Sequence, residues 1–160
     1  MSNPHLTKGS SHFKTGRYKE AIEVYGKIGK SSKSYPYALF NIGKCYFKQE
    51  KFIEAIKYYS QIPNNHSLYK SALFNCGSSF YNLDKCPKAI EMYSKILKSS
   101  NYYQEAQYYL GEYHFKAMEM SDKVDKSTIS YIEKNFNLIE YISSRKKLTL
   151  IFYVLDKVLT

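Results

Sequence analysis

Residues 36–69 read PYALFNIGKCYFKQEKFIEAIKYYSQIPNNHSLY, and this stretch decides the fold. Its first half carries apolar side chains at Leu39, Ile42 and Tyr46, the spacing of one face of an amphipathic helix. A polar run interrupts this pattern, and a second apolar helical face follows in FIEAIKYYSQI. Pro63 and the two asparagines after it end the second helix, because proline cannot continue a helix and asparagine favours turns. The stretch therefore predicts two amphipathic helices joined by a short turn.

The same pattern recurs along the chain at a step of 34 residues. Four glycines are in register, namely Gly9, Gly43, Gly77 and Gly111. Other series with this step are Ala21, Ala55 and Ala89, then Tyr25, Tyr59 and Tyr93, then Phe13, Phe47, Tyr81 and Phe115. The register predicts an array over residues 2–137, with repeats at about 2–35, 36–69 and 70–103 and a degenerate fourth at 104–137.

The small residues of the register predict close packing of the two helices in each repeat. A glycine in the middle of a helix costs about 1 kcal/mol relative to alanine, so each of the four indicates a site without room for a side chain. We expect the alanine series to face these glycines from the second helix and the tyrosine series to fill the space around that contact. These residues are therefore interpreted as repeat packing.

This register resembles the tetratricopeptide repeat family over residues 2 to about 118. The resemblance rests on Leu39, Ile42-Gly43, Tyr46, Phe52, Ala55, Tyr59 and Ile62, which recur as Leu73, Cys76-Gly77, Phe80, Cys86, Ala89, Tyr93 and Ile96. It implies an all-α, right-handed superhelical solenoid of antiparallel helix pairs. It also implies a non-catalytic scaffold or adaptor that holds a partner protein or peptide in a concave groove.

The resemblance further implies that the first helix of each pair lines that groove. The candidate partner-binding residues are Phe13, Lys14, Tyr37, Phe40, Asn41, Lys44, Phe47, Lys48, Phe74, Asn75, Tyr81, Tyr108 and Phe115. Rings would supply anchor pockets, the amides of Asn41 and Asn75 would bond a peptide backbone, and the lysines would favour an acidic ligand. The alternative is that several of these rings pack between repeats and never meet a ligand.

One specialised form of this groove is not supported. Some family members clamp the acidic C-termini of chaperones with five lysine, asparagine and arginine side chains. Of the five corresponding positions in this chain, Asn41 alone carries the required residue. The sequence therefore predicts a different ligand.

Residues 138–160 leave the repeat pattern and carry an apolar stretch from Leu148 to Leu159. A solenoid needs a terminal cap with a polar outer face, and this stretch is apolar on more than one face. The alternatives are a capping helix, a self-association surface that makes the protein a structural subunit of a larger assembly, and the interrupted end of a longer array.

The charge balance raises nucleic-acid binding as a further alternative. Lysine and arginine total 24 against 14 acidic residues, a net charge of +10. Only Arg17 and Arg145 are arginine, the residue best suited to phosphate and base contacts, and no nucleic-acid motif is present. The sequence therefore disfavours this alternative.

The sequence contains no motif for catalysis. No phosphate loop, triad spacing or His/Cys ligand pair occurs, so we expect no enzymatic activity, small-molecule substrate, cofactor or metal. Neither a signal peptide nor a membrane-spanning run is apparent, and the three cysteines form no CxxC pair. These features predict a reducing compartment, cytoplasmic or nuclear.

Overall fold

The computed structural model describes residues 3–96, 101–103, 106 and 109. The chain divides into two compact units, Met1–Ile96, here the N-terminal unit, and Leu97–Thr160. The N-terminal unit contains α1 (Pro4–Lys14), α2 (Tyr18–Gly26), α3 (Tyr35–Lys48), α4 (Phe52–Tyr59), α5 (Tyr69–Asn82) and α6 (Cys86–Ser94). No strand occurs among the described residues.

The predicted fourth repeat and the C-terminal segment lie almost entirely outside the described residues. Among them are Tyr108, Gly111, Phe115 and the apolar stretch from Leu148 to Leu159. Their roles and the predicted domain boundaries therefore remain predictions.

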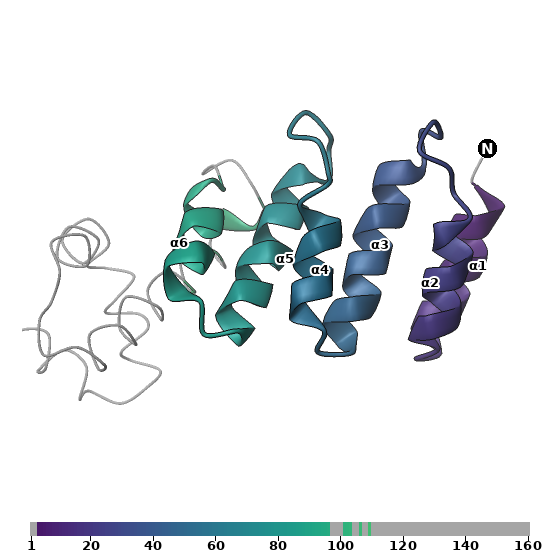
Figure 1. Cartoon of the computed structure of the whole chain (residues 1–160). Coiled ribbons are helices and arrows are strands. Elements are labelled where there is room, and N and C mark those ends of the chain that lie inside the picture. The colour runs from purple at the N-terminus through teal and green to yellow at the C-terminus, as the bar shows by residue number, and fades with distance from the viewer. Residues whose placement is uncertain (1–2, 97–100, 104–105, 107–108, 110–160) are drawn as a thin grey trace, which may run out of the picture. The chain divides into compact units, whose positions relative to one another are not determined.

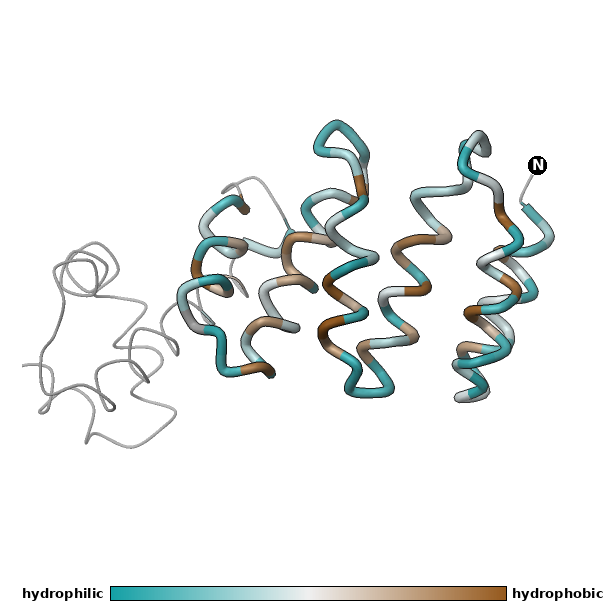
Figure 2. The backbone as a smooth tube through the Cα atoms, in the orientation of Figure 1, coloured by the Kyte–Doolittle hydropathy of each residue, from teal (hydrophilic) through white to brown (hydrophobic). Residues whose placement is uncertain are grey.

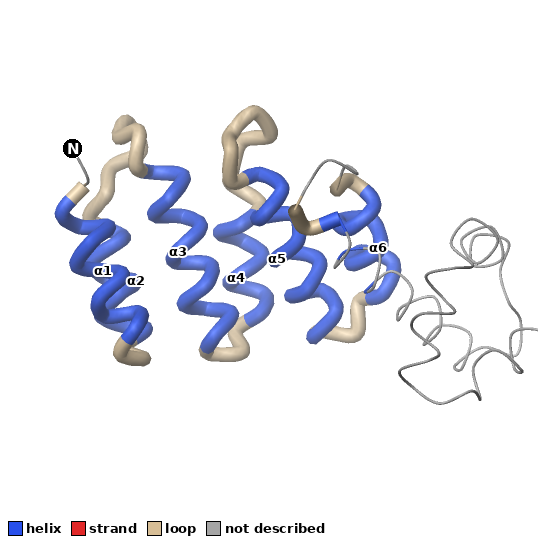
Figure 3. Tube along the Cα trace, turned by 180° about the vertical axis from the view of Figure 1, so that it is seen from behind, coloured by secondary structure: helices blue, strands red, loops and turns tan. Residues whose placement is uncertain are grey.

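The helices form three antiparallel pairs, α1 with α2, α3 with α4, and α5 with α6 (Figure 1). Short turns join the helices within a pair along one edge of the N-terminal unit. The longer loops between pairs lie along the opposite edge (Figure 3). The fold is thus an all-α solenoid of helix pairs, as the 34-residue register predicts.

The turn within each pair reverses the chain through one residue in the left-handed backbone region. These residues are Gly16, Glu50 and Asp84, with φ of 74°, 59° and 53°. In the first pair the N–H of Arg17, the next residue, donates to the carbonyl of His12 at 2.9 Å, and the other two turns repeat this bond. This is the closure of a Schellman motif, which satisfies carbonyls at the end of a helix.

The core runs within and between the pairs. The alanine and tyrosine series of the register are buried, with exposed fractions of 0–2% for Ala21, Ala55, Ala89, Tyr25, Tyr59 and Tyr93. Between pairs, Ala38, Ile42 and Cys45 of α3 pack with buried residues of the first pair. Hydrophilic residues are concentrated in the turns and loops (Figure 2). Apolar burial of this kind supplies the main favourable free energy of folding.

The outer face of α1 differs from the equivalent faces of α3 and α5. Ala38, Ile42 and Cys45 of α3 are buried against the preceding pair, and their counterparts in α5 are also buried. The equivalent residues of α1, 34 positions earlier in the chain, are Pro4, Lys8 and Ser11, and all three are exposed. The outer face of α1 is therefore more polar than the equivalent face of α3.

Candidate functional site

The glycines of the register identify the side of each first helix that faces its partner. A Cβ atom added at Gly43 would lie 2.6 Å from Cε1 of Tyr59, and one added at Gly77 would lie 2.5 Å from Cε1 of Tyr93. Gly9 meets Tyr25 in the same way. The tyrosine ring is therefore the nearest side chain to the glycine in all three described pairs, as expected of a tyrosine series that fills the space around this contact.

Helical geometry then locates the opposite side. At about 100° per residue, Asn41 and Lys48 lie roughly 160° and 140° around α3 from Gly43, and Lys44 lies roughly 100° from it. We call this surface the first-helix face. Its residues are Thr7, Ser10 and Lys14 of α1, Asn41, Lys44 and Lys48 of α3, and Asn75, Ser78 and Asn82 of α5.

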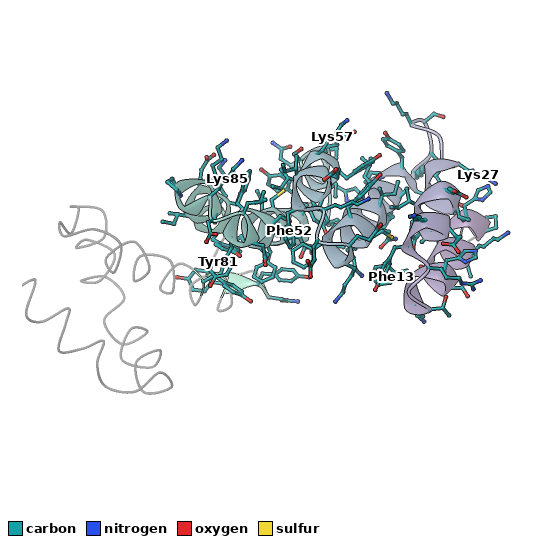
Figure 4. The ribbon with its side chains drawn as sticks, turned by 60° about the horizontal axis from the view of Figure 1, so that its bottom comes forward. Phe13, Lys27, Phe52, Lys57, Tyr81 and Lys85 are labelled. Atoms are coloured by element: carbon teal, nitrogen blue, oxygen red, sulfur yellow. The ribbon has the colours of Figure 1, made fainter. Side chains whose placement is uncertain are left out.

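Figure 4 shows the two sides of the N-terminal unit. Phe13 and Tyr81, from the ends of α1 and α5, lie on one side, whereas Lys57 and Lys85 lie on the other. Lys44 belongs to the side of Phe13, because its Nζ lies 4.8 Å from the centroid of the Phe13 ring.

Lys44 breaks the chemical pattern of its register position. In the first and third pairs this position is serine, and the hydroxyl groups of Ser10 and Ser78 share hydrogen bonds with Tyr25 Oη and Tyr93 Oη at 3.2 and 3.1 Å. In the middle pair Lys44 takes this position and lies over the ring of Phe13 from the preceding pair. The sequence register could have identified this difference, since the three positions are 34 residues apart.

The amides of Asn41 and Asn75 are available to a ligand. Both residues are half-buried on the first-helix face. Among the described residues, neither side-chain amide forms a hydrogen bond within the protein. Neither Asn41 nor Asn75 contains a fully buried side-chain nitrogen or oxygen that lacks a partner. Each amide therefore retains a donor and an acceptor for a polypeptide backbone.

Four of the predicted groove rings contact an aromatic ring of their own helix pair. Phe13, Phe40 and Phe47 also pack against buried clusters that include residues of the next pair. Phe40 and Phe74 contact the buried tyrosines Tyr59 and Tyr93 with ring centroids 5.6 and 5.7 Å apart. Phe13 contacts Tyr18 at 5.5 Å in the first pair, and Phe47 contacts Phe52 at 5.3 Å in the second. These four rings and Tyr81 remain half-buried, so each offers part of its surface.

Among the described members of the predicted set, Tyr37, Lys14 and Lys48 are exposed. Tyr37 is 41% exposed and contacts His66 of the following loop with an edge-on geometry, at 5.1 Å between centroids. Sequence reasoning did not identify His66. Its position gives a signal, because His66 is in register with Ser32, and both side chains accept a hydrogen bond from the N–H two residues later.

Charge separates the two sets of helices. The first helices, α1, α3 and α5, carry no acidic residue, and their lysines are Lys8, Lys14, Lys44, Lys48 and Lys70. The second helices, α2, α4 and α6, mix both signs with Lys19, Lys57, Lys88, Glu20, Glu23, Glu54 and Glu91. Glu91 pairs with Lys95, just beyond α6, at 2.7 Å on the exposed surface. Charge counted by whole repeats averages the two sets and hides this separation.

The buried thiols are unsuited to nucleophilic chemistry. Burial raises the pKa of Cys45 and of Cys76 to about 12, which keeps both thiols protonated near neutral pH. No three His, Cys, Asp or Glu side chains gather into a possible metal site within the described ranges. No described helix is long and apolar enough to cross a membrane.

Comparisons with known proteins agree with this architecture. Two models of the tetratricopeptide repeat match the chain, one over residues 36–62 and one over residues 4–28. No curated protein matches it.

Several solved structures have a similar fold. A crystal structure of MamA has a TM-score of 0.61 and 21% identity, and the match covers 86% of this chain and 84% of that one. A second MamA structure has a TM-score of 0.65 and 20% identity, covering 91% and 76%. The TPR-like repeats of a putative kinesin light chain from Podosopora anserina have a TM-score of 0.57 and 11% identity, covering 93% and 80%. At these identities the likeness shows the fold alone.

Proposed function

Because the chain is a tetratricopeptide repeat protein, a family whose members are generally non-catalytic interaction scaffolds, we propose that it is an adaptor. Its ligand is a segment of a partner protein, bound in an extended conformation along the first-helix face. The adaptor has no enzymatic activity of its own and acts in the cytoplasm or nucleus. Free, buried Cys45 and Cys76 are in keeping with a reducing compartment.

The observation that carries this proposal is the repetition of an unpartnered amide on the same face. Asn41 and Asn75 occupy one register position in successive first helices, so their amides follow the solenoid at the interval of one repeat. An extended backbone presents N–H and C=O groups along its length and can bond to both. The half-buried rings beside them offer apolar surface for ligand side chains.

Peptide selection tests the proposal. A library of random 12-residue peptides displayed on phage is selected on the immobilised full-length chain, and affinities of the enriched peptides are measured by fluorescence polarisation. Replacing both Asn41 and Asn75 with Ala should weaken binding about tenfold or more, because two hydrogen bonds of about 0.5–1.5 kcal/mol each are lost.

Asn64→Ala is the matched control, since Asn64 is exposed in the loop between α4 and α5. Its affinity should equal that of the wild type, and circular dichroism should show that all variants fold. An absence of enriched peptides, or full affinity in the double variant, would contradict the proposal.

A further inference from the structure

We propose that the ligand carries an aspartate or glutamate side chain opposite Lys44, and that Lys44 fixes the register of the bound segment. This inference rests on the proposed function and specifies its ligand class. It makes Lys44 the specificity-determining residue of the first-helix face.

The first argument is the distribution of charge over the helices. Of the five lysines on α1, α3 and α5, Lys14, Lys44 and Lys48 lie on the first-helix face. These three helices carry no carboxylate, whereas the second helices carry lysines and glutamates together. A ligand on the first-helix face therefore meets positive charge without competing acidic side chains. Charge complementarity of this kind accelerates association and excludes like-charged partners.

The second argument is the surroundings of Lys44. No carboxylate of the described residues lies within 4.0 Å of its Nζ, and its close contact is the face of the Phe13 ring. A cation over an aromatic face is held by about 0.5–1 kcal/mol without being neutralised. Lys44 is therefore positioned in advance and keeps its charge for a ligand.

The third argument is the position of Lys44 among the free amides. Asn41 lies three residues before it on the same helix, and Asn75 occupies the next pair. Residues three apart on a helix are neighbours on its surface. A ligand backbone bonded to Asn41 thus brings one of its side chains near Lys44. In the first and third pairs the serine at this position forms a hydrogen bond with a buried tyrosine. Of the three described pairs, the middle one alone therefore offers a cation at this position.

These features fit a peptide carboxylate better than a nucleic-acid backbone. The lysines of this face are Lys14, Lys44 and Lys48, and Lys44 is the one three residues from an unpartnered amide. It matches one carboxylate flanked by peptide groups. A polyanion needs a row of cations, and the register mates Ser10 and Ser78 are neutral.

A charge-swap selection tests the inference. The same peptide library is selected on the wild type, on Lys44→Glu and on the control Lys57→Glu, whose lysine lies on the opposite side (Figure 4). The wild type and the control should enrich aspartate or glutamate at one fixed position of the consensus. Lys44→Glu should enrich lysine or arginine there. The displayed peptides are fused through their C-termini, so an enriched carboxylate comes from a side chain.

Single peptides then give the magnitude. Changing the enriched acidic residue to lysine should weaken binding to the wild type at least tenfold and restore it on Lys44→Glu. An unchanged consensus on Lys44→Glu, or a consensus without a fixed acidic position, would overturn the inference and leave the adaptor intact.

Two further outcomes are decisive. If the wild type enriches no peptide, the proposed function fails and the inference fails with it. If the chain instead shifts labelled single-stranded nucleic acid at micromolar concentration, and Lys44→Glu abolishes that salt-dependent shift, the ligand is a polyanion and the peptide assignment is wrong.

Discussion

A glycine and a tyrosine sixteen residues later set how closely the two helices of each pair approach. The ring of Tyr59 occupies the space that a side chain at position 43 would need, and the other two described pairs repeat the arrangement. Glycine is unfavourable in a helix interior, yet here it allows a large ring to be buried against the backbone. The buried ring offsets the helical cost of the glycine.

We predict that Gly43→Ala destabilises the protein by about 1–3 kcal/mol, the usual cost of overpacking a core. The new methyl group would meet the Tyr59 ring at 2.6 Å, so the ring or the helix must move. Gly26→Ala is the control, because no atom lies within 4 Å of the added Cβ and its φ is not positive. The control should gain up to about 1 kcal/mol from helix propensity. Urea denaturation followed by circular dichroism measures both, and a Gly43→Ala variant as stable as the wild type would refute the packing argument.

Sequence reasoning at this scale found the position and named the alanine and tyrosine series around it, but it did not tell which of the two lies nearest. The cost of a mid-helix glycine indicates that something lies close, and the register shows that the site is structural. It does not tell which side chain approaches, because that depends on how far each side chain reaches across the gap. Lys44 and Phe13 belong to successive pairs, so their contact could not be predicted from the sequence of either repeat alone.

The first helices α1, α3 and α5 share one register but differ in the side chains of their outer faces. The face that buries Ile42 and Cys45 in α3 carries Lys8 and Ser11 in α1, where it is exposed. The same backbone element therefore carries a polar or an apolar outer face according to a few side chains.

We predict that Lys8→Ile combined with Ser11→Ala makes the N-terminal unit self-associate. The two changes give α1 an apolar outer face like that of α3, and such a face seeks a partner surface. Static light scattering should show a mass that rises with concentration above that of the wild type. Lys14→Ile with Thr15→Ala, at the end of the same helix, controls for the loss of polar residues. Equal masses for both variants would mean that the register position is not what matters.

The helices themselves were largely predictable from the sequence. Apolar periodicity and the turn residues located the six helices of the N-terminal unit, and the register paired them correctly. The second helix of the middle pair ends at Tyr59, before Ile62, although the apolar pattern continues to that residue. Ile62 is buried after the helix has ended, so burial alone cannot mark a helix boundary. The separation of charge between first and second helices could also be predicted from the sequence, provided that charges are counted for each helix separately.

On the scale of the whole molecule, positive charge is concentrated in the N-terminal unit. Residues 1–96 hold 15 basic and 6 acidic residues, a net of +9 out of +10 for the chain. The unit is held together by a core of buried aliphatic, alanine, tyrosine and cysteine side chains. Its stability should therefore depend on keeping the buried titratable groups neutral.

We predict that the protein loses stability as the pH rises above 9. Burial raises the pKa of Cys45 and Cys76 from 9.0 to about 12, so the unfolded chain releases these protons first. The contribution of the two protonated thiols to stability is therefore fully present below pH 9 and is lost between pH 9 and 12. At pH 10 the free energy of unfolding is lower by about 2–3 kcal/mol for both thiols together. Buried Tyr25 and Tyr59, whose pKa values are also raised, add to the loss above pH 10.

Urea midpoints at pH 8 and pH 10 measure the effect, and Cys45→Ala with Cys76→Ala should reduce the difference between them. A double variant with an undiminished difference would assign the loss to other groups.

Gly9, Gly43 and Gly77 each meet a tyrosine of their own 34-residue copy, and this has a consequence for how such a chain can change in length. Duplication or loss of one of these whole copies in the gene would leave the remaining members of the three with their own rings. A change of half a copy would separate a glycine from its tyrosine and leave the helix pair without its closest contact. Lineages of this protein should therefore differ by complete copies, and each added copy would extend the first-helix face by one more first helix.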